Sequence, residues 1–128
     1  MQQHFILYVR DQEAGTAFYS AVLAMEPRLF VPGMTEFQLG PDTILGLMPE
    51  TGIRRLLGPA LPDPAQAAGT PRAELYLLVP DALPYHQRAL EHGARELSPL
   101  LERGWGHCAA YSLDADGHVL AFAQTGSD

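Results

Sequence analysis

The clearest pattern of apolar and polar positions lies in residues 105–124, WGHCAAYSLDADGHVLAFAQ. Two mostly apolar runs flank the tetrapeptide at 114–117, DADG. Aspartate side chains bond the local backbone in turns, and glycine takes a positive φ without steric cost, so the pattern predicts a β-hairpin. The second run is apolar on both of its alternating faces. We therefore expect one face to pack on a helix and the other to line a cavity.

The first 49 residues contain a strand pattern followed by a helix pattern. Residues 4–11 alternate as a strand does, and Asp11 is a suitable N-cap for a helix that runs to about Ala24. The apolar stripe predicted for this helix consists of Ala14, Ala17, Phe18, Ala21, Val22 and Met25. Pro27 ends the helix. Three short strands are expected after it, at 28–31, 36–39 and 43–48.

The same order of elements then begins again. Residues 74–81 match 4–11 in strand phase, with Asp81 in the place of Asp11. A helix is expected from the Asp81 cap to His92, with Gly93 as a left-handed residue after it. Strands are expected at 95–100, 105–113 and 118–123. Each half therefore has the order β-α-β-β-β, and such an internal repeat is stronger evidence than either helix alone.

The repeat predicts an α+β fold in a single domain, residues 1–128. Module one covers 1–49 and module two covers 72–128. The segment between them, 50–71, is rich in proline and glycine and is interpreted as a linker, with a short helical turn at 53–57.

Composition narrows the function classes. A chain of 128 residues with 47% hydrophobic residues can bury a core without disulfides. The net charge of −7 argues against a nucleic-acid partner, and no apolar run is long enough to predict a membrane partner. The single cysteine, Cys108, is typical of a reducing compartment, and the N-terminus lacks a signal-peptide pattern. We therefore expect a cytoplasmic protein.

The repeat, with D-x-E-A-x-x-A-F-Y at 11–19 and D-x-D-G-H-x-L at 114–120, resembles the vicinal oxygen chelate superfamily. Glyoxalase I, extradiol dioxygenases, fosfomycin-resistance enzymes and bleomycin-resistance proteins belong to it. The resemblance implies two tandem βαβββ modules that form a curled mixed sheet around a shared cavity, the glyoxalase/bleomycin-resistance/dioxygenase fold. It also implies a homodimer, and the bleomycin-resistance-like branch is favoured.

Enzymes of this family hold a divalent metal on the first and last strands of each module. By resemblance the first-strand positions fall on His4 and Glu74, which could coordinate. The last-strand positions fall near Gly46 and on Ala121, which cannot. Catalytic sites normally use at least three protein ligands, and His107 is the candidate for the third. The DADG turn is too short for a calcium loop.

Seven side chains are candidates to bind a small molecule, because alternation places them on the strand faces opposite the helices: His4, Tyr8, Glu74, Tyr76, Trp105, His107 and Tyr111. Together they would form an aromatic wall with a few polar groups, the usual composition of a ligand site. Each also has a structural reading. His4 and Glu74 could be a polar pair, and the aromatic residues could pack in a core or an interface.

Two function classes follow from the candidate residues, and no catalytic residue is assigned in either. The favoured one is a metal-free protein, without a cofactor, that sequesters an aromatic or amphipathic compound in a dimer cavity. The alternative is a glyoxalase-like lyase, isomerase or dioxygenase in which His4, Glu74 and His107 hold Mn, Fe, Ni or Zn. A third reading, a domain that has no ligand and only associates with partners, also stays open.

Overall fold

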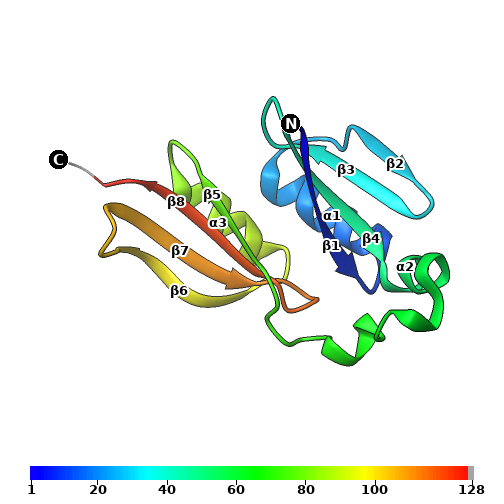
Figure 1. Cartoon of the computed structure of the whole chain (residues 1–128). Helices are drawn as coiled ribbons and strands as arrows, with labels where there is room; N and C mark the ends of the chain where they lie inside the picture. The colour runs from blue at the N-terminus through cyan, green and yellow to red at the C-terminus, as the bar shows by residue number, and fades with distance from the viewer. Residues whose placement is uncertain (127–128) are drawn as a thin grey trace. The chain divides into compact units, whose positions relative to one another are not determined.

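The computed structural model describes residues 1–126. The chain forms two compact units, Met1–Ala68 and Gly69–Asp128. Each unit has a four-stranded mixed sheet with a helix between its first and second strands (Figure 1). The predicted α+β fold with two βαβββ modules is therefore confirmed.

Unit 1 has the strand order β1-β4-β3-β2. β1 pairs with β4 in parallel, and the other neighbours are antiparallel. The strands are β1 (Gln3–Val9), β2 (Leu29–Val31), β3 (Met34–Gln38) and β4 (Thr43–Pro49). Helix α1 (Gln12–Leu23) begins where the sequence predicted, since the Asp11 carboxylate accepts a hydrogen bond from the Ala14 amide at 3.0 Å.

The apolar stripe predicted for α1 is mostly wrong. The buried residues of the helix are Thr16, Tyr19, Val22 and Leu23, of which the prediction contained one. Thr16 can be buried because its hydroxyl bonds the Gln12 carbonyl and the Thr35 hydroxyl of β3, both at 2.8 Å. A polar contact between distant residues therefore rotates the helix away from the face that its alanines suggested.

The segment after β4 contains more helix than the sequence predicted. Helix α2 runs from Glu50 to Leu57, where a short turn at 53–57 was expected. Two 3₁₀ helices follow, η1 (Gly58–Ala60) and η2 (Pro64–Ala67). Both have a proline in the first turn, where the missing N–H costs no hydrogen bond.

Unit 2 has the order β5-β8-β7-β6, with β5 parallel to β8 and the others antiparallel. Its strands are β5 (Glu74–Leu78), β6 (Arg95–Glu102), β7 (His107–Leu113) and β8 (Val119–Thr125). Helix α3 (Ala82–Glu91) crosses between β5 and β6. Gly93 has φ +104, as predicted for the residue after this helix.

One face of the unit 2 sheet packs on α3. The ring of Phe122 is fully buried and stacks on Tyr85 of the helix, with centroids 5.0 Å apart. The Ala82 amide at the helix N-terminus donates to Gln124 Oε1 at 2.8 Å. Phe122 and Gln124 are two apart on β8 and share a face, so the face that carries Ala121 and Ala123 is turned away from the helix.

The predicted strand 105–113 begins two residues later than expected. β7 starts at His107, so Trp105 lies in the turn between β6 and β7. The Arg103 amide bonds the His107 carbonyl at 2.8 Å, and Gly106 has φ +90. The turn therefore closes across Trp105 and leaves its side chain 58% exposed.

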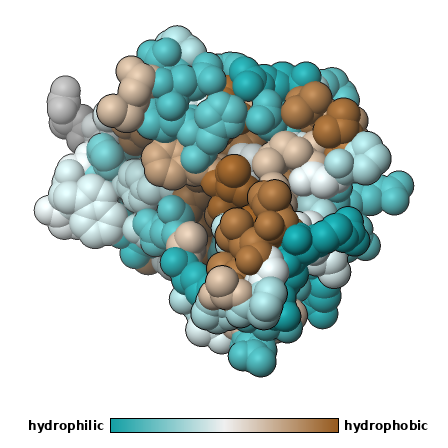
Figure 2. Space-filling view, turned by 45° about the vertical axis from the view of Figure 1, so that its right-hand side comes forward, coloured by the Kyte–Doolittle hydropathy of each residue, from teal (hydrophilic) through white to brown (hydrophobic). Residues whose placement is uncertain are grey.

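Large apolar side chains reach the surface in both units, including Phe5 and Phe30 of unit 1 and Leu78 and Trp105 of unit 2. Figure 2 shows hydrophobic residues at the surface beside hydrophilic ones. Exposed apolar patches of this kind are typical of surfaces that contact a ligand or another chain. Among residues 1–126, no helix is long and apolar enough to cross a membrane.

Candidate functional site

Three of the predicted site residues are joined by direct hydrogen bonds in unit 2. Tyr76 lies on β5, His107 at the start of β7, and Trp105 in the preceding turn. The Trp105 indole donates to Tyr76 Oη at 2.9 Å, and Tyr76 Oη lies 2.7 Å from His107 Nδ1. The rings of Tyr76 and His107 also stack, with centroids 5.8 Å apart. We call Trp105, Tyr76 and His107 the aromatic triad.

Tyr111 shares the sheet face of the aromatic triad. Tyr76 of β5 and Tyr111 of β7 both pair with Ala121 of β8, which lies between them. Residues directly opposite one another in a sheet project to the same side. Ala121 is fully buried, so the small side chain forms the base between two tyrosines, on the face opposite α3.

Glu74 also acts on this face. The pKa of Tyr111 is raised above its ordinary value of 10.0, first by burial and then by the negative charge of Glu74 and by Tyr76. The positive charge of Arg103 opposes the rise. Because the folded chain holds the phenol proton more tightly than the unfolded chain, this contribution to stability is complete below about pH 10 and is lost as pH rises above it, through the higher pKa of the folded state.

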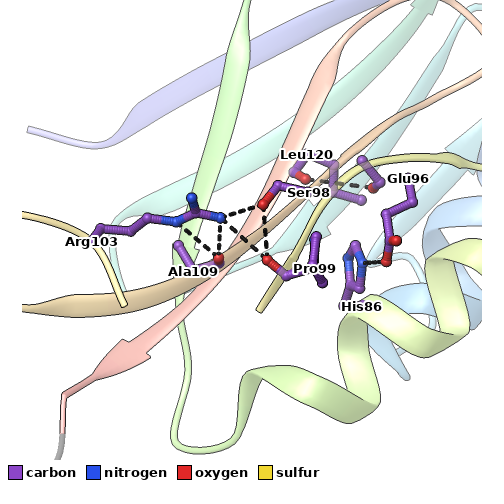
Figure 3. Close-up of polar contacts among 8 residues, drawn as sticks. His86, Glu96, Ser98, Pro99, Arg103, Ala109 and Leu120 are labelled. Carbon is purple, nitrogen blue, oxygen red and sulfur yellow. Dashed lines mark hydrogen bonds and ion pairs between the residues drawn. The ribbon is translucent and has the colours of Figure 1, made fainter. Parts of the chain in front are cut away.

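Arg103 is a residue that the sequence interpretation missed. Its guanidinium lies 5.0 Å from the centre of the Tyr111 ring. Nε and Nη2 donate to the Ala109 carbonyl at 3.2 and 2.8 Å, and Nη2 also contacts Ser98 Oγ at 2.6 Å (Figure 3). The contacts are possible because β6 shifts register on both sides of Ser98. An arginine directly before the Gly104-Trp105-Gly106 turn was the available signal.

A second polar pair in the same unit connects α3 with β6. His86 is almost fully buried, and its Nε2 lies 2.8 Å from Glu96 Oε2 (Figure 3). Ser112 and Leu120, on the helix side of β7 and β8, are also buried. The pair therefore fixes the helix to the strand and lies on the sheet face opposite the aromatic triad.

In unit 1, the predicted residues His4 and Tyr8 lie on β1. His4 contacts Glu36 of β3, Nδ1 to Oε2 at 3.5 Å, and its Nε2 lies 3.1 Å from Gln2 Oε1. Glu36 Oε1 in turn accepts a bond from Arg28 Nε at 2.9 Å. Tyr8 is half-buried and lies four residues after His4 on β1, on the same face of the strand. The sequence interpretation missed Glu36, whose alternation on β3 was the available signal.

The donor groups described here do not fit a catalytic metal. Gly46 and Ala121 have no donor atoms, and both ring nitrogens of His4 face oxygen atoms. The ring nitrogen that carries the proton toward such an oxygen has no lone pair for a metal, and a metal at the other nitrogen would have to displace the oxygen beside it. The nearby Glu36 is already paired with Arg28, and the bond from Tyr76 to His107 Nδ1 leaves only Nε2 of that ring. A metal would have to displace the partners of His4 and Glu36.

Asp114, Asp116 and His118 also lie close together, with one potential ligand atom of each within 4.8 Å. The Asp114 carboxylate accepts hydrogen bonds from the Asp116 amide at 3.0 Å and from the His118 amide at 2.9 Å. It also lies 3.3 Å from His118 Nδ1. These are the bonds of the predicted hairpin turn, and Gly117 has φ +88. The cluster therefore stabilises the turn.

A groove opens elsewhere, in unit 1. It is shallow and open, with a volume of about 770 Å³. Its lining residues are Arg10, Asp11, Gln12, Glu13, Phe30, Val31 and Pro32. None of the seven predicted ligand-binding residues lines it, so the groove is separate from the candidate site.

Comparisons with solved structures confirm the fold. A glyoxalase-related enzyme from Fulvimarina pelagi matches with a TM-score of 0.81 and 22% identity, over 98% of this chain and 89% of that one. A glyoxalase/bleomycin resistance protein/dioxygenase family enzyme from Burkholderia phytofirmans PsJN matches with a TM-score of 0.78 and 16% identity, over 95% and 96%. TnmS3, an antibiotic binding protein from Streptomyces sp. CB03234, matches with a TM-score of 0.71 and 24% identity, over 98% and 96%.

No curated protein matches the chain. The family model that matches is described as Glyoxalase/Bleomycin resistance protein/Dioxygenase superfamily, and the match covers residues 2–122. It therefore covers module one, module two as far as Phe122 in β8, and all seven predicted site residues. The chain belongs to the glyoxalase/bleomycin resistance protein/dioxygenase superfamily.

Proposed function

We propose that this protein is a metal-free binding protein that sequesters an aromatic or amphipathic small molecule. The observation that carries the proposal is the aromatic triad, Trp105, Tyr76 and His107, on the sheet face opposite α3. Two stacked rings and a half-exposed indole provide a flat apolar surface, with polar atoms at fixed places. Such a surface suits stacking against an aromatic compound.

The donor chemistry supports binding without a metal. Two of the four family ligand positions are Gly46 and Ala121, and His4 is engaged by Glu36 and Gln2. A guanidinium, Arg28, already supplies the positive charge beside Glu36. The assembly that we propose is a homodimer, as the family resemblance implies.

The fold comparison supports the same class by analogy. TnmS3 is by its description an antibiotic binding protein, and it shares this fold at a TM-score of 0.71. At 24% identity the likeness concerns the fold alone, so the ligand of this chain must be identified by experiment.

The experiment is a compound screen on chelator-treated protein that follows tryptophan fluorescence. The chain has one tryptophan, so every change reports on Trp105. We expect saturable changes with aromatic or amphipathic compounds, and the same affinity before and after metal is added. Binding that appears only after a divalent metal is restored would contradict the proposal and favour the enzyme with His4, Glu74 and His107 as ligands.

A further inference from the structure

We propose that the aromatic triad selects an aromatic compound that carries an anionic oxygen, such as a carboxylate. His107 Nε2–H and Arg103 Nη1 would donate to that oxygen, and Tyr76 would act as a positioning residue that sets the tautomer of His107. The inference rests on the proposed binding function and names the chemical class of its ligand.

The donor properties of the triad set the direction of its hydrogen bonds. The indole N–H of Trp105 can only donate, so Tyr76 Oη accepts at 2.9 Å. The hydroxyl of Tyr76 keeps one proton to donate, and its other partner among the described residues is His107 Nδ1, at 2.7 Å. The bond therefore runs from Trp105 to Tyr76 and from Tyr76 to His107.

This direction fixes the tautomer of neutral His107. Because Nδ1 accepts from Tyr76, the ring proton is on Nε2. Within residues 1–126, Nε2 makes no hydrogen bond with another residue, whereas Nδ1 is occupied. The histidine is thus held as a donor whose N–H is accepted by no described residue, and the matching group on a ligand is a hydrogen-bond acceptor.

Arg103 adds a positive charge on the same sheet face. Its Nε and Nη2 are used by Ala109, Ser98 and Pro99, which anchor the guanidinium. Figure 3 shows the other terminal nitrogen, Nη1, without a bond to a described residue. The side chain is therefore oriented in advance, and its remaining donor can meet an anionic oxygen without losing a protein contact.

The acidic groups do not reverse this preference. The net charge of −7 acts over long distances and is screened by salt, whereas direct contacts at a partly buried site are screened much less. Glu74 is exposed, and no ion pair in the described chain joins it to Arg103. The negative charge of Glu74 disfavours any negative group on the ligand beyond the one that Arg103 and His107 hold. The ligand that fits therefore has one anionic group on an aromatic body.

The first test measures the tautomer and needs no ligand. Nitrogen NMR of the full chain at about pH 8.5, where an ordinary histidine is neutral, reports which ring nitrogen of His107 carries the proton. We expect the Nε2–H form alone in the wild type, and in Tyr76→Phe the mixture of both tautomers that an unconstrained histidine ring shows. Tyr85→Phe is the matched control, because Tyr85 stacks on Phe122 on the helix side. An Nδ1–H form in the wild type, or no change in Tyr76→Phe, would overturn the positioning role.

The second test uses two probes with one aromatic body, 2-naphthoate and 2-naphthylmethylammonium, followed by Trp105 fluorescence. We expect the carboxylate to bind at least about tenfold more tightly, a typical effect of a charge-assisted hydrogen bond. The preference should shrink in Arg103→Gln. The preference for the carboxylate should also shrink in His107→Phe. This variant keeps an aromatic ring at position 107 and leaves the hydrogen bonds of Arg103 intact.

The outcomes separate the two proposals. Equal affinities, or tighter binding of the ammonium probe, would overturn the anionic class and leave the binding function standing. A chain that binds neither probe nor any compound of the screen would contradict the binding function itself, and the inference with it.

Discussion

Gly117→Ala is expected to lower the free energy of unfolding by about 2–4 kcal/mol. Gly117 has φ +88, and an alanine there costs about 1 kcal/mol in backbone strain. A Cβ would also lie 2.6 Å from the Gly69 carbonyl carbon, a backbone atom that cannot rotate away, and overpacking costs about 1–3 kcal/mol. Equilibrium unfolding in urea, followed by circular dichroism, measures the loss.

Gly33→Ala is the matched control for this prediction. Gly33 has a similar φ of +97, but a Cβ there meets nothing within 4 Å. We expect it to lose only the strain, about 1 kcal/mol. Equal losses in the two variants would mean that Gly69 does not pack against the hairpin turn.

Trp105→Ala is expected to weaken the binding of a compound found in the screen by about 1–3 kcal/mol, about 5–150-fold in Kd. The loss combines the stacking surface with the donor that orients Tyr76. Because the side chain is 58% exposed in a turn, the stability of the fold should change little. Isothermal titration calorimetry measures Kd without the fluorescence of the tryptophan.

Leu83→Ala is the control for Trp105→Ala. Leu83 is also a large exposed apolar residue of unit 2, at 44%. It lies on α3, which packs on the sheet face opposite the aromatic triad. We expect its Kd to match the wild type. An unchanged Kd in Trp105→Ala would remove this residue from the site.

Features that depend on neighbouring residues could be predicted from the sequence. The hairpin turn follows from two aspartates and a glycine that bond their own backbone, and the structure has those bonds. The start of α1 follows from Asp11, and the end of α3 from Gly93. The repeat of these local signals was sufficient for the βαβββ order of each unit.

Features that depend on distant partners could not be predicted in the same way. The buried face of α1 is set by Thr16 and Thr35, which are 19 residues apart. The anchoring of Arg103 depends on register shifts in β6 that alternation cannot show. The strand face of Tyr76 and His107 was predicted, but the bond between them, 31 residues apart, appears only in the structure.

Metal binding by the purified chain tests the central proposal most directly. The metal content is measured first, and the stripped protein is then titrated calorimetrically with Mn²⁺, Fe²⁺, Ni²⁺ and Zn²⁺, with His4→Ala alongside. We predict no stoichiometric binding, because His4 and Glu36 are engaged by protein partners and Gly46 and Ala121 offer no side-chain ligand. Tight binding of one ion per chain that is lost in His4→Ala would contradict the metal-free account.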